Sequence, residues 1–188
     1  MTKIKNRKSV RLQSWDYSSD AYYFVTICTQ NRESIFGEIV YRKMMLNQYG
    51  TIVENVWKSL PNHHNVFLDK HQTMPNHFHG IIICTGVAMN GCTGVARNAP
   101  TRNENNIFSK ISPKLNSLSV VVRSFKSECT KQIHQINPNL PVWQRNYYEH
   151  IIRNEAELIK IQNYIIDNPA MWFRDRNNPD NMKFMNHA

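Results

Sequence analysis

The sequence has few cysteines and no long apolar run, and both absences narrow the class of protein. The four cysteines show neither the C-x-x-C spacing of zinc sites nor the density of a secreted disulfide framework. No stretch approaches the ~18 apolar residues of a membrane span, and the basic start of the chain lacks the apolar segment of a signal peptide. We therefore expect a cytoplasmic protein in a reducing compartment, without membrane association.

Acidic residues are also scarce, with 14 Asp and Glu against 23 Lys and Arg, so the net charge is +9. Five cations precede the first acidic residue, Asp16: Lys3, Lys5, Arg7, Lys8 and Arg11. Such an excess favours a polyanionic partner such as nucleic acid, because each phosphate that is neutralised releases condensed counterions. Charge alone does not identify the partner, since many basic proteins bind nothing in particular.

The 188 residues fit one domain with its own core. Periodicity predicts strands at 22–29, 35–41, 66–73, 77–84 and 142–153, and helices at 52–60, 118–136 and 154–168. This order predicts an α+β fold, with an antiparallel sheet and helices on one face. We expect a basic N-terminal arm at 1–21, the folded domain at 22–170 with a flexible loop at 85–117, and a C-terminal tail at 171–188.

Two histidines stand two residues apart at the head of an apolar, β-branched run. Strand periodicity places the imidazoles of His77 and His79 on one face of the strand and Phe78 on the other. Two neutral imidazoles side by side on a stiff strand form half of a divalent-metal site. The sequence therefore predicts a metal centre if a third ligand arrives from elsewhere in the chain.

The predicted helix at 154–168 offers both a ligand and a nucleophile. Tyr164 falls at the edge of its apolar stripe, and Asn168 lies four residues further on the same surface row. If this helix lies near the histidine strand, the Asn168 amide oxygen can complete the ligands and the Tyr164 phenol can stand beside the ion. A phenol has a pKa near ~10, so it needs help at neutral pH, and a metal that polarises a phosphate lowers that demand.

At these residues the chain resembles a known family. His77-Phe78-His79 matches the His-hydrophobe-His motif of the HUH single-strand nucleases, and Tyr164 with Asn168-Pro169 matches the tyrosine helix of their one-tyrosine transposase branch. Repeat-associated (REP-associated) tyrosine transposases also carry segments like MPNHFHG at 74–80 and WQRNYYEHIIR at 143–153. The resemblance covers roughly residues 9 to 175 without the loop at 85–117.

The resemblance implies a ferredoxin-like α+β fold and a metal-dependent transposase acting on single-stranded DNA. By this resemblance His77, His79 and Asn168 bind Mg or Mn, and Tyr164 attacks a phosphodiester to give a 5′-phosphotyrosine link and a free 3′-hydroxyl. The DNA is expected to be a hairpin or palindromic repeat. Relatives work as monomers or as homodimers, so both assemblies stay open.

Several further residues are candidates for DNA contacts: Arg7, Arg11, Arg145, His150 and Arg153. Each is equally explained as a solvated charge or as support for the core. Trp172 and Phe173 could stack on bases or simply dock the tail. Tyr147 and Tyr148 are rival nucleophiles, although their expected strand and aromatic surroundings favour packing.

Two alternative functions remain open from the sequence. The first is a catalytically silent module of the same fold that binds a DNA hairpin or repeat. The second is a metal-dependent phosphohydrolase in which water is the nucleophile and Tyr164 is dispensable. Tyr164→Phe should leave cleavage intact in the phosphohydrolase but abolish the covalent DNA adduct in the transposase. Absence of any adduct from wild type would favour the binding module.

Overall fold

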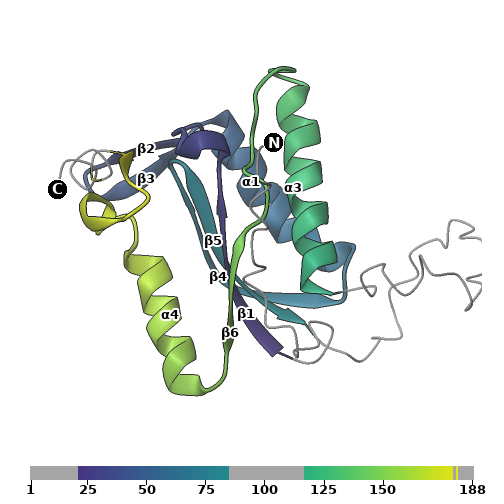
Figure 1. Ribbon diagram of the computed structural model, residues 1–188, viewed down its shortest axis with the longest axis vertical. Helices are drawn as coiled ribbons and strands as arrows, with labels where there is room; N and C mark the ends of the chain where they lie inside the picture. Colours follow the sequence, from purple (N-terminus) through teal and green to yellow (C-terminus); the bar gives the residue numbers. More distant parts are fainter. Residues whose placement is uncertain (1–20, 85–116, 180, 182–188) are drawn as a thin grey trace, which may run out of the picture.

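A computed structural model describes residues 21–84, 117–179 and 181. Its main sheet has four strands in the order β4-β5-β1-β6, with antiparallel pairing throughout, and β2 and β3 form a separate hairpin (Figure 1). The elements are β1 (Ala21–Cys28), η1 (Gln30–Arg32), β2 (Gly37–Val40), β3 (Lys43–Leu46), α1 (Gln48–Ser59), η2 (Leu60–Asn62), β4 (Val66–Met74), β5 (His77–Cys84), α3 (Leu118–His134), β6 (Tyr148–Ile152), α4 (Glu155–Asp167) and η3 (Trp172–Arg174).

The element order confirms the predicted α+β class and the ferredoxin-like topology. Without the β2–β3 hairpin the chain runs β1, α1, β4, β5, α3, β6, which is the split βαβ arrangement. β1 and β5 lie at the centre of the sheet, and β4 and β6 lie at its edges. The two central strands therefore have a neighbour on each side.

One face of the sheet carries the main core and is covered by α1 and α3. Tyr23, Val25 and Ile27 point to this face and pack with apolar residues of both helices. Trp57 of α1 packs at the centre, with its ring centroid 4.6 Å from that of Phe78 and 5.4 Å from that of Phe125. Gly80 leaves room for this indole, because a Cβ there would lie 2.5 Å from the Trp57 ring.

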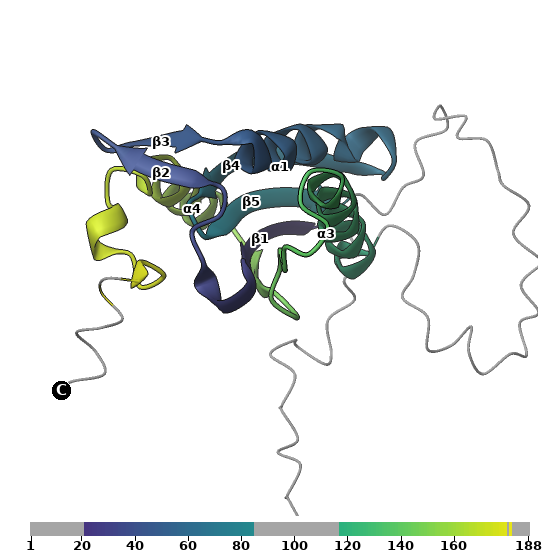
Figure 2. The same ribbon diagram turned by 90° about the horizontal axis from the view of Figure 1, so that it is seen from above.

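The opposite face is covered by α4, so the expectation that the helices lie on one face holds for α1 and α3 only. Phe24, Ile81, Ile152 and Ile165 form a second apolar cluster beneath α4. Figure 1 and the view from above in Figure 2 both place α4 across the sheet from α3. The physical reason is that both faces of the central strands are apolar, so a single helical layer leaves one of them exposed to water.

Two predicted strands differ from the structure. The strand expected at 142–153 begins only at Tyr148, because Asn146 has a positive φ of 68°, which breaks the extended backbone. Before this break Trp143 makes an isolated antiparallel bridge to Thr29, and the Lys126 ammonium binds the carbonyls of Gln144 and Asn146. The strand expected at 35–41 is half of the β2–β3 hairpin, whose turn residues Tyr41 and Arg42 both have positive φ. That turn lacks the Asn-Gly or Asp-Gly signal of such hairpins, so β3 went unpredicted.

The expected arm at 1–21 and the loop at 85–117 lie almost entirely outside the described residues. Among the helices that the structure does describe, none is both long and apolar enough to cross a membrane. The first part of the expected tail, residues 171–179, folds back onto the domain, and Asp175, Asn177 and Asn178 are buried.

A partly buried carboxylate, that of Glu54, joins α1 to β4 and makes the fold sensitive to acid. Glu54 accepts hydrogen bonds from the Thr73 hydroxyl at 2.6 Å and from His71 Nε2 at 2.9 Å. Burial raises the pKa of the Glu54 carboxyl, but the hydrogen bonds from His71 and Thr73 outweigh it and lower the pKa from 4.5 to about 2. An acid whose pKa is lower in the folded than in the unfolded state stabilises the fold at pH values above its unfolded-state pKa. This stabilisation is lost as the pH falls through its folded-state pKa.

We expect Glu54→Gln to lower the free energy of unfolding at pH 7 by about 2 kcal/mol, after allowance for solvent screening. The difference from the parent protein should shrink as the pH falls from 4.5 toward 2. Urea unfolding across that range measures it, with Glu38→Gln on the exposed face of β2 as the control. A stability difference that stays constant across this range contradicts the assignment.

Candidate active site

His77 and His79 lie on the α4 side of β5 and point toward one another. Their register partners on β1 are Cys28 and Thr26. The two Nε2 atoms are 2.9 Å apart, and the side chains are 0% and 2% exposed. The predicted imidazole pair is therefore present, with its ring nitrogens directed at a common point.

The opposite nitrogen of each ring is held by the protein. Asn76 donates from Nδ2 to the carbonyls of Arg32 and Asn177, at 3.0 and 2.8 Å, so its Oδ1 is the acceptor that faces His77 Nδ1 at 2.8 Å. His77 Nδ1 must then carry the hydrogen, which leaves the Nε2 lone pair free. This is the arrangement found around metal-binding histidines, where the second nitrogen fixes the tautomer.

His79 has a more adaptable partner. Its Nδ1 lies 2.9 Å from the Thr26 hydroxyl, which can donate or accept. His79 Nε2 can therefore carry the hydrogen shared with His77, or present its own lone pair. Both imidazoles are thus held in position, whereas the proton of neutral His79 can lie on either Nδ1 or Nε2.

The electrostatics keep both rings neutral at physiological pH. Burial lowers the pKa of His77 to about 3, and the charges of Arg32 and Arg176 act in the same direction. Burial also holds the pKa of His79 well below its ordinary value, with a further contribution from His77. Neutral imidazoles are the metal-binding form, so the site is ready to coordinate a cation without first losing a proton.

Asp175 is a candidate ligand that the sequence did not indicate. Its carboxylate Oδ2 is 3.8 Å from His77 Nε2, and ligand atoms of His77, His79 and Asp175 all lie within 4.8 Å of one another. Asp175 follows η3 and is 98 residues from His77 along the chain, so no local spacing connects them. Only the folding of residues 171–179 onto the sheet brings the carboxylate to the imidazoles.

Tyr164 stands beside the imidazole pair, because α4 covers the face of the sheet on which the two histidines lie. Its hydroxyl oxygen is 3.4 Å from His79 Nε2, and its ring meets that of Phe24 edge to face at 6.0 Å. The side chain is 47% exposed, so the phenol remains accessible. Burial and the Asp175 charge raise the pKa of Tyr164, whereas the Asn168 side chain and Arg176 lower it to a smaller extent.

Asn168 ends α4 and places an unused acceptor at the same site. It is buried, and its Oδ1 makes no hydrogen bond to any residue of the described ranges. It lines a cavity of about 520 Å³ together with His79, Tyr164 and Asp175. A buried carbonyl oxygen without a partner is costly, and a bound cation would satisfy it. Imidazole nitrogens with carboxylate and amide oxygens suit Mn or a similar divalent ion better than Mg alone.

The predicted DNA contacts are not brought together here. His150 Nε2 is 2.7 Å from Glu157 Oε1, and the same carboxylate accepts from the backbone N–H of Arg153, so these residues help to start α4. The side chains of Arg145 and Arg153 are exposed. Arg7 and Arg11 lie outside the described residues. Tyr147 packs against the α1/α3 core, whereas Tyr148 lines the site cavity.

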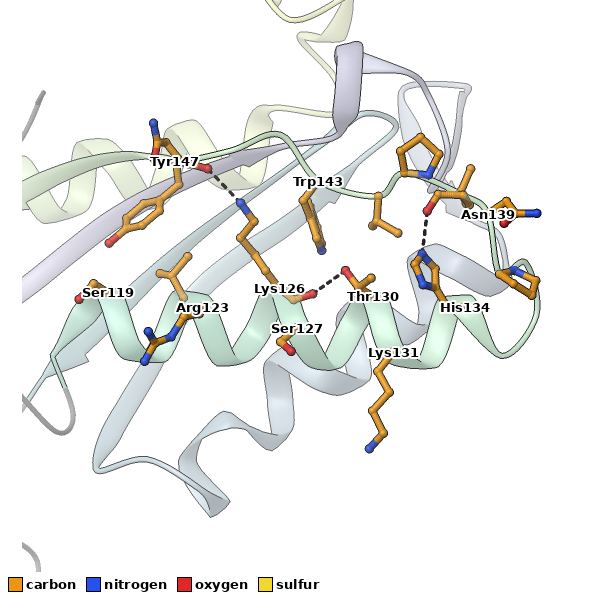
Figure 3. A pocket seen from close by; sticks show the side chains of 16 residues that line it. Ser119, Arg123, Lys126, Ser127, Thr130, Lys131, His134, Asn139, Trp143 and Tyr147 are labelled. Carbon is orange, nitrogen blue, oxygen red and sulfur yellow. Dashed lines mark hydrogen bonds between the residues drawn. The ribbon is translucent and has the colours of Figure 1, made fainter. Parts of the chain in front are cut away.

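A larger cavity of about 880 Å³ lies elsewhere, between α3 and residues 138–147. Figure 3 shows Lys126 reaching from α3 across this space toward the facing segment, where it donates to backbone carbonyls. The histidine that lines this cavity, His134, has its Nε2 2.9 Å from the carbonyl oxygen of Leu140. This cavity lacks a cluster of metal ligands among the described residues, so the smaller cavity beside Tyr164 is the candidate active site.

The comparisons with known proteins support a family and a fold. No family model matches the chain. A protein of Haemophilus influenzae, described as uncharacterized, is 36% identical over 174 residues, which is 92% of this chain and 93% of that protein. The chain belongs to the same family as this protein.

Among solved structures, a REP-associated tyrosine transposase bound to a REP hairpin has a TM-score of 0.56 and 14% identity, over 87% of this chain and 73% of that one. The present chain therefore shares the fold of that structure. A protein of Deinococcus radiodurans R1, described as a candidate transposase, has a TM-score of 0.43 with 12% identity over 86% of this chain and 97% of that one. A likeness this loose carries no further conclusion.

The Asn76 contacts lead to a prediction about metal affinity. Asn76→Leu removes the acceptor that orients His77, so we expect Mn²⁺ to bind about 10- to 100-fold more weakly. Asn76→Asp keeps an acceptor toward Nδ1 and should lose less. Isothermal titration with Mn²⁺ measures both, and thermal unfolding checks that each variant is folded. Equal Mn²⁺ affinity in the parent and a folded Asn76→Leu variant would show that Asn76 does not orient a ligand.

Proposed function

We propose that this protein is a metal-dependent endonuclease and strand transferase of single-stranded DNA, with Tyr164 as its nucleophile. The observation that supports this best is the Tyr164 hydroxyl, 3.4 Å from His79 Nε2 of the buried imidazole pair. A half-exposed phenol next to neutral, preoriented imidazoles is an arrangement suited to covalent attack on a phosphodiester. The shared fold with a REP-associated tyrosine transposase is in accord with this proposal.

The metal, Mg or Mn, would be held by His77, His79 and Asn168, with Asp175 as an additional oxygen ligand. Asp175 contributes the one negative charge in this set and so offsets part of the charge of a dication. The ion, when bound, would stabilise negative charge developing on the phosphate oxygens. Asn76 and Thr26 would contribute by holding the two imidazoles in the orientation that metal binding requires.

Tyr164 carries out the exchange of bonds. Its phenolic oxygen forms a bond to phosphorus as the bond between phosphorus and the 3′-oxygen breaks, and the phenolic proton is balanced by protonation of that 3′-oxygen. The products are a 5′-phosphotyrosine link and a free 3′-hydroxyl. A second 3′-hydroxyl can reverse the step and join strands, because the covalent link conserves the energy of the original bond.

The substrate we propose is a DNA hairpin or palindromic repeat with a single-stranded flank. The excess of basic residues supports a nucleic-acid partner, and the transposase of the same fold was solved with a REP hairpin. Arg145 and Arg153 are exposed and available for backbone contacts, with Arg7 and Arg11 as further candidates. We propose that the protein acts in the cytoplasm, as a monomer or homodimer.

The nucleophile is tested by Tyr164→Phe. Tyr22→Phe serves as the control, because Tyr22 lies on the face of β1 that α4 covers but outside the cavity. Wild type incubated with a labelled library of single-strand hairpins and Mn²⁺ should give a protein–DNA adduct on denaturing gels. Tyr164→Phe should give no adduct yet bind DNA with unchanged affinity, and Tyr22→Phe should behave as wild type. Cleavage that persists in Tyr164→Phe would favour a water nucleophile, and no adduct from wild type on any hairpin would favour a DNA-binding module.

The ligand set is tested by two neighbouring variants. We expect Asp175→Asn to weaken Mn²⁺ binding more than Asn168→Ala does, because it removes a negatively charged ligand rather than a neutral one. Each should cost on the order of tenfold or more in affinity. Titration calorimetry with Mn²⁺ measures both. If neither variant binds Mn²⁺ more weakly, the oxygen ligands have been assigned wrongly.

A further inference from the structure

Tyr148 is an aromatic residue of the site cavity to which the proposed chemistry gives no role. It lies on one rung of the sheet with Thr26 and His79, since Thr26 pairs with His79 on one side and with Tyr148 on the other. Directly paired residues point to the same face, and adjacent strands are ~4.8 Å apart. Tyr148 therefore projects to the α4 side, ~10 Å from the backbone of His79.

The Tyr148 ring is presented to solvent. It is 44% exposed, and it makes no side-chain hydrogen bond to any residue in the described ranges. Its recorded aromatic contact is with Phe24, at 6.5 Å and an interplanar angle of 71°. A large aromatic side chain with nearly half of its surface open to water differs from a core tyrosine, which would be buried with its hydroxyl satisfied.

Phe24 links this ring to the candidate active site. The Phe24 ring stacks on His79 at 5.4 Å, and it meets both Tyr164 and Tyr148 edge to face. It is itself almost fully buried. Phe24 therefore contacts the rings of Tyr148, Tyr164 and His79 and links Tyr148 to the candidate active site.

The cavity that these residues share has an aromatic end and a charged end. Phe24, Tyr148 and Met171 provide apolar surface, and the lining also includes two cations, Arg174 and Arg176, against one carboxylate, that of Asp175. A nucleotide combines a flat aromatic base with an anionic phosphate. This pairing of surfaces matches a nucleotide better than a purely apolar or a purely anionic ligand.

We propose that Tyr148 forms a base-stacking subsite, which binds an unpaired nucleobase adjacent to the phosphodiester at Tyr164. The inference rests on the proposed function, because it assumes that a single DNA strand lies in this cavity. Stacking on an aromatic ring accepts any base, since every base has a π-face. The subsite thus holds the strand in place beside Tyr164 and leaves sequence recognition to other contacts.

The test uses the full chain carrying Tyr164→Phe, so that binding reaches equilibrium without cleavage. One probe is a fluorescently labelled single strand of random sequence, and the other is a strand of equal length built entirely from abasic nucleotides. Adding Tyr148→Ala should weaken binding of the first probe by about tenfold and leave binding of the abasic strand unchanged. Tyr148→Phe should restore the affinity, because it retains the ring.

Tyr22→Ala is the matched control. Tyr22 is a tyrosine of similar exposure, at 40%. It lies on β1, on the same face of the sheet as Tyr148, but outside the lining of the cavity. It should have no effect on either probe. Thermal unfolding of each variant separates a loss of stacking from a loss of fold. If Tyr148→Ala is unstable, Tyr148→Leu replaces it, because leucine keeps apolar bulk without an aromatic ring and should lose the same base-dependent part of the binding.

Three results would overturn the subsite. In the first, the folded Tyr148→Ala variant binds the random strand as tightly as its parent. In the second, Tyr148→Ala weakens binding of the random strand and of the abasic strand equally. In the third, the parent binds the abasic strand as tightly as the random strand. The outcome is independent of the adduct assay. A base-dependent effect of Tyr148 without any adduct from wild type would leave the subsite standing and reject the strand transferase. An adduct from wild type together with unchanged DNA binding by Tyr148→Ala would support the strand transferase and reject the subsite.

Discussion

The antiparallel pairing of β1 with β5 is the constraint on which the site depends. Its register places Thr26 beside His79 and Cys28 beside His77, and it sends both imidazoles to the face opposite the main core. A shift of one residue would turn the imidazoles into the apolar layer beneath α1 and α3 and bring Phe78 out. The apolar side chains that alternate with the site residues, Tyr23, Val25, Phe78 and Ile82, make such a shift costly.

The two faces of the sheet have different roles, since one carries the main core and the other carries the candidate active site. The face toward α1 and α3 is a closed apolar layer centred on Trp57, and it holds the strands in register. The other face has only a small apolar cluster around Ile165, next to which buried polar groups are left with unusual properties. There the two imidazoles remain neutral and Asn168 Oδ1 lacks a partner in the described part of the chain. Such groups cost free energy in an isolated fold and are explained when a ligand satisfies them.

What the sequence could predict was set by local spacing. His77 and His79 share a strand, and Tyr164 and Asn168 share a helix face, so periodicity alone placed each pair correctly with respect to its own element. The hydroxyl of Tyr164 then came to lie beside His79 because α4 covers the second face, which periodicity did not specify. Asp175, Tyr148 and the bonds of Asn76 depend on contacts between distant segments or on the β1–β6 register. The length of β6 was also overestimated, because the extended backbone is broken at Asn146, whose positive φ the alternation of side chains did not indicate.

The hydrogen bond from Asn76 to the Asn177 carbonyl has a consequence for the last part of the chain. The segment that follows α4 carries Asp175 and at the same time supplies an acceptor to the residue that orients His77. If the cavity beside Tyr164 binds a cation, docking of this segment and ion binding are thermodynamically linked, and each favours the other by the same free energy. Residues that orient the imidazoles and a residue that can ligate the ion thus belong to one connected set of contacts.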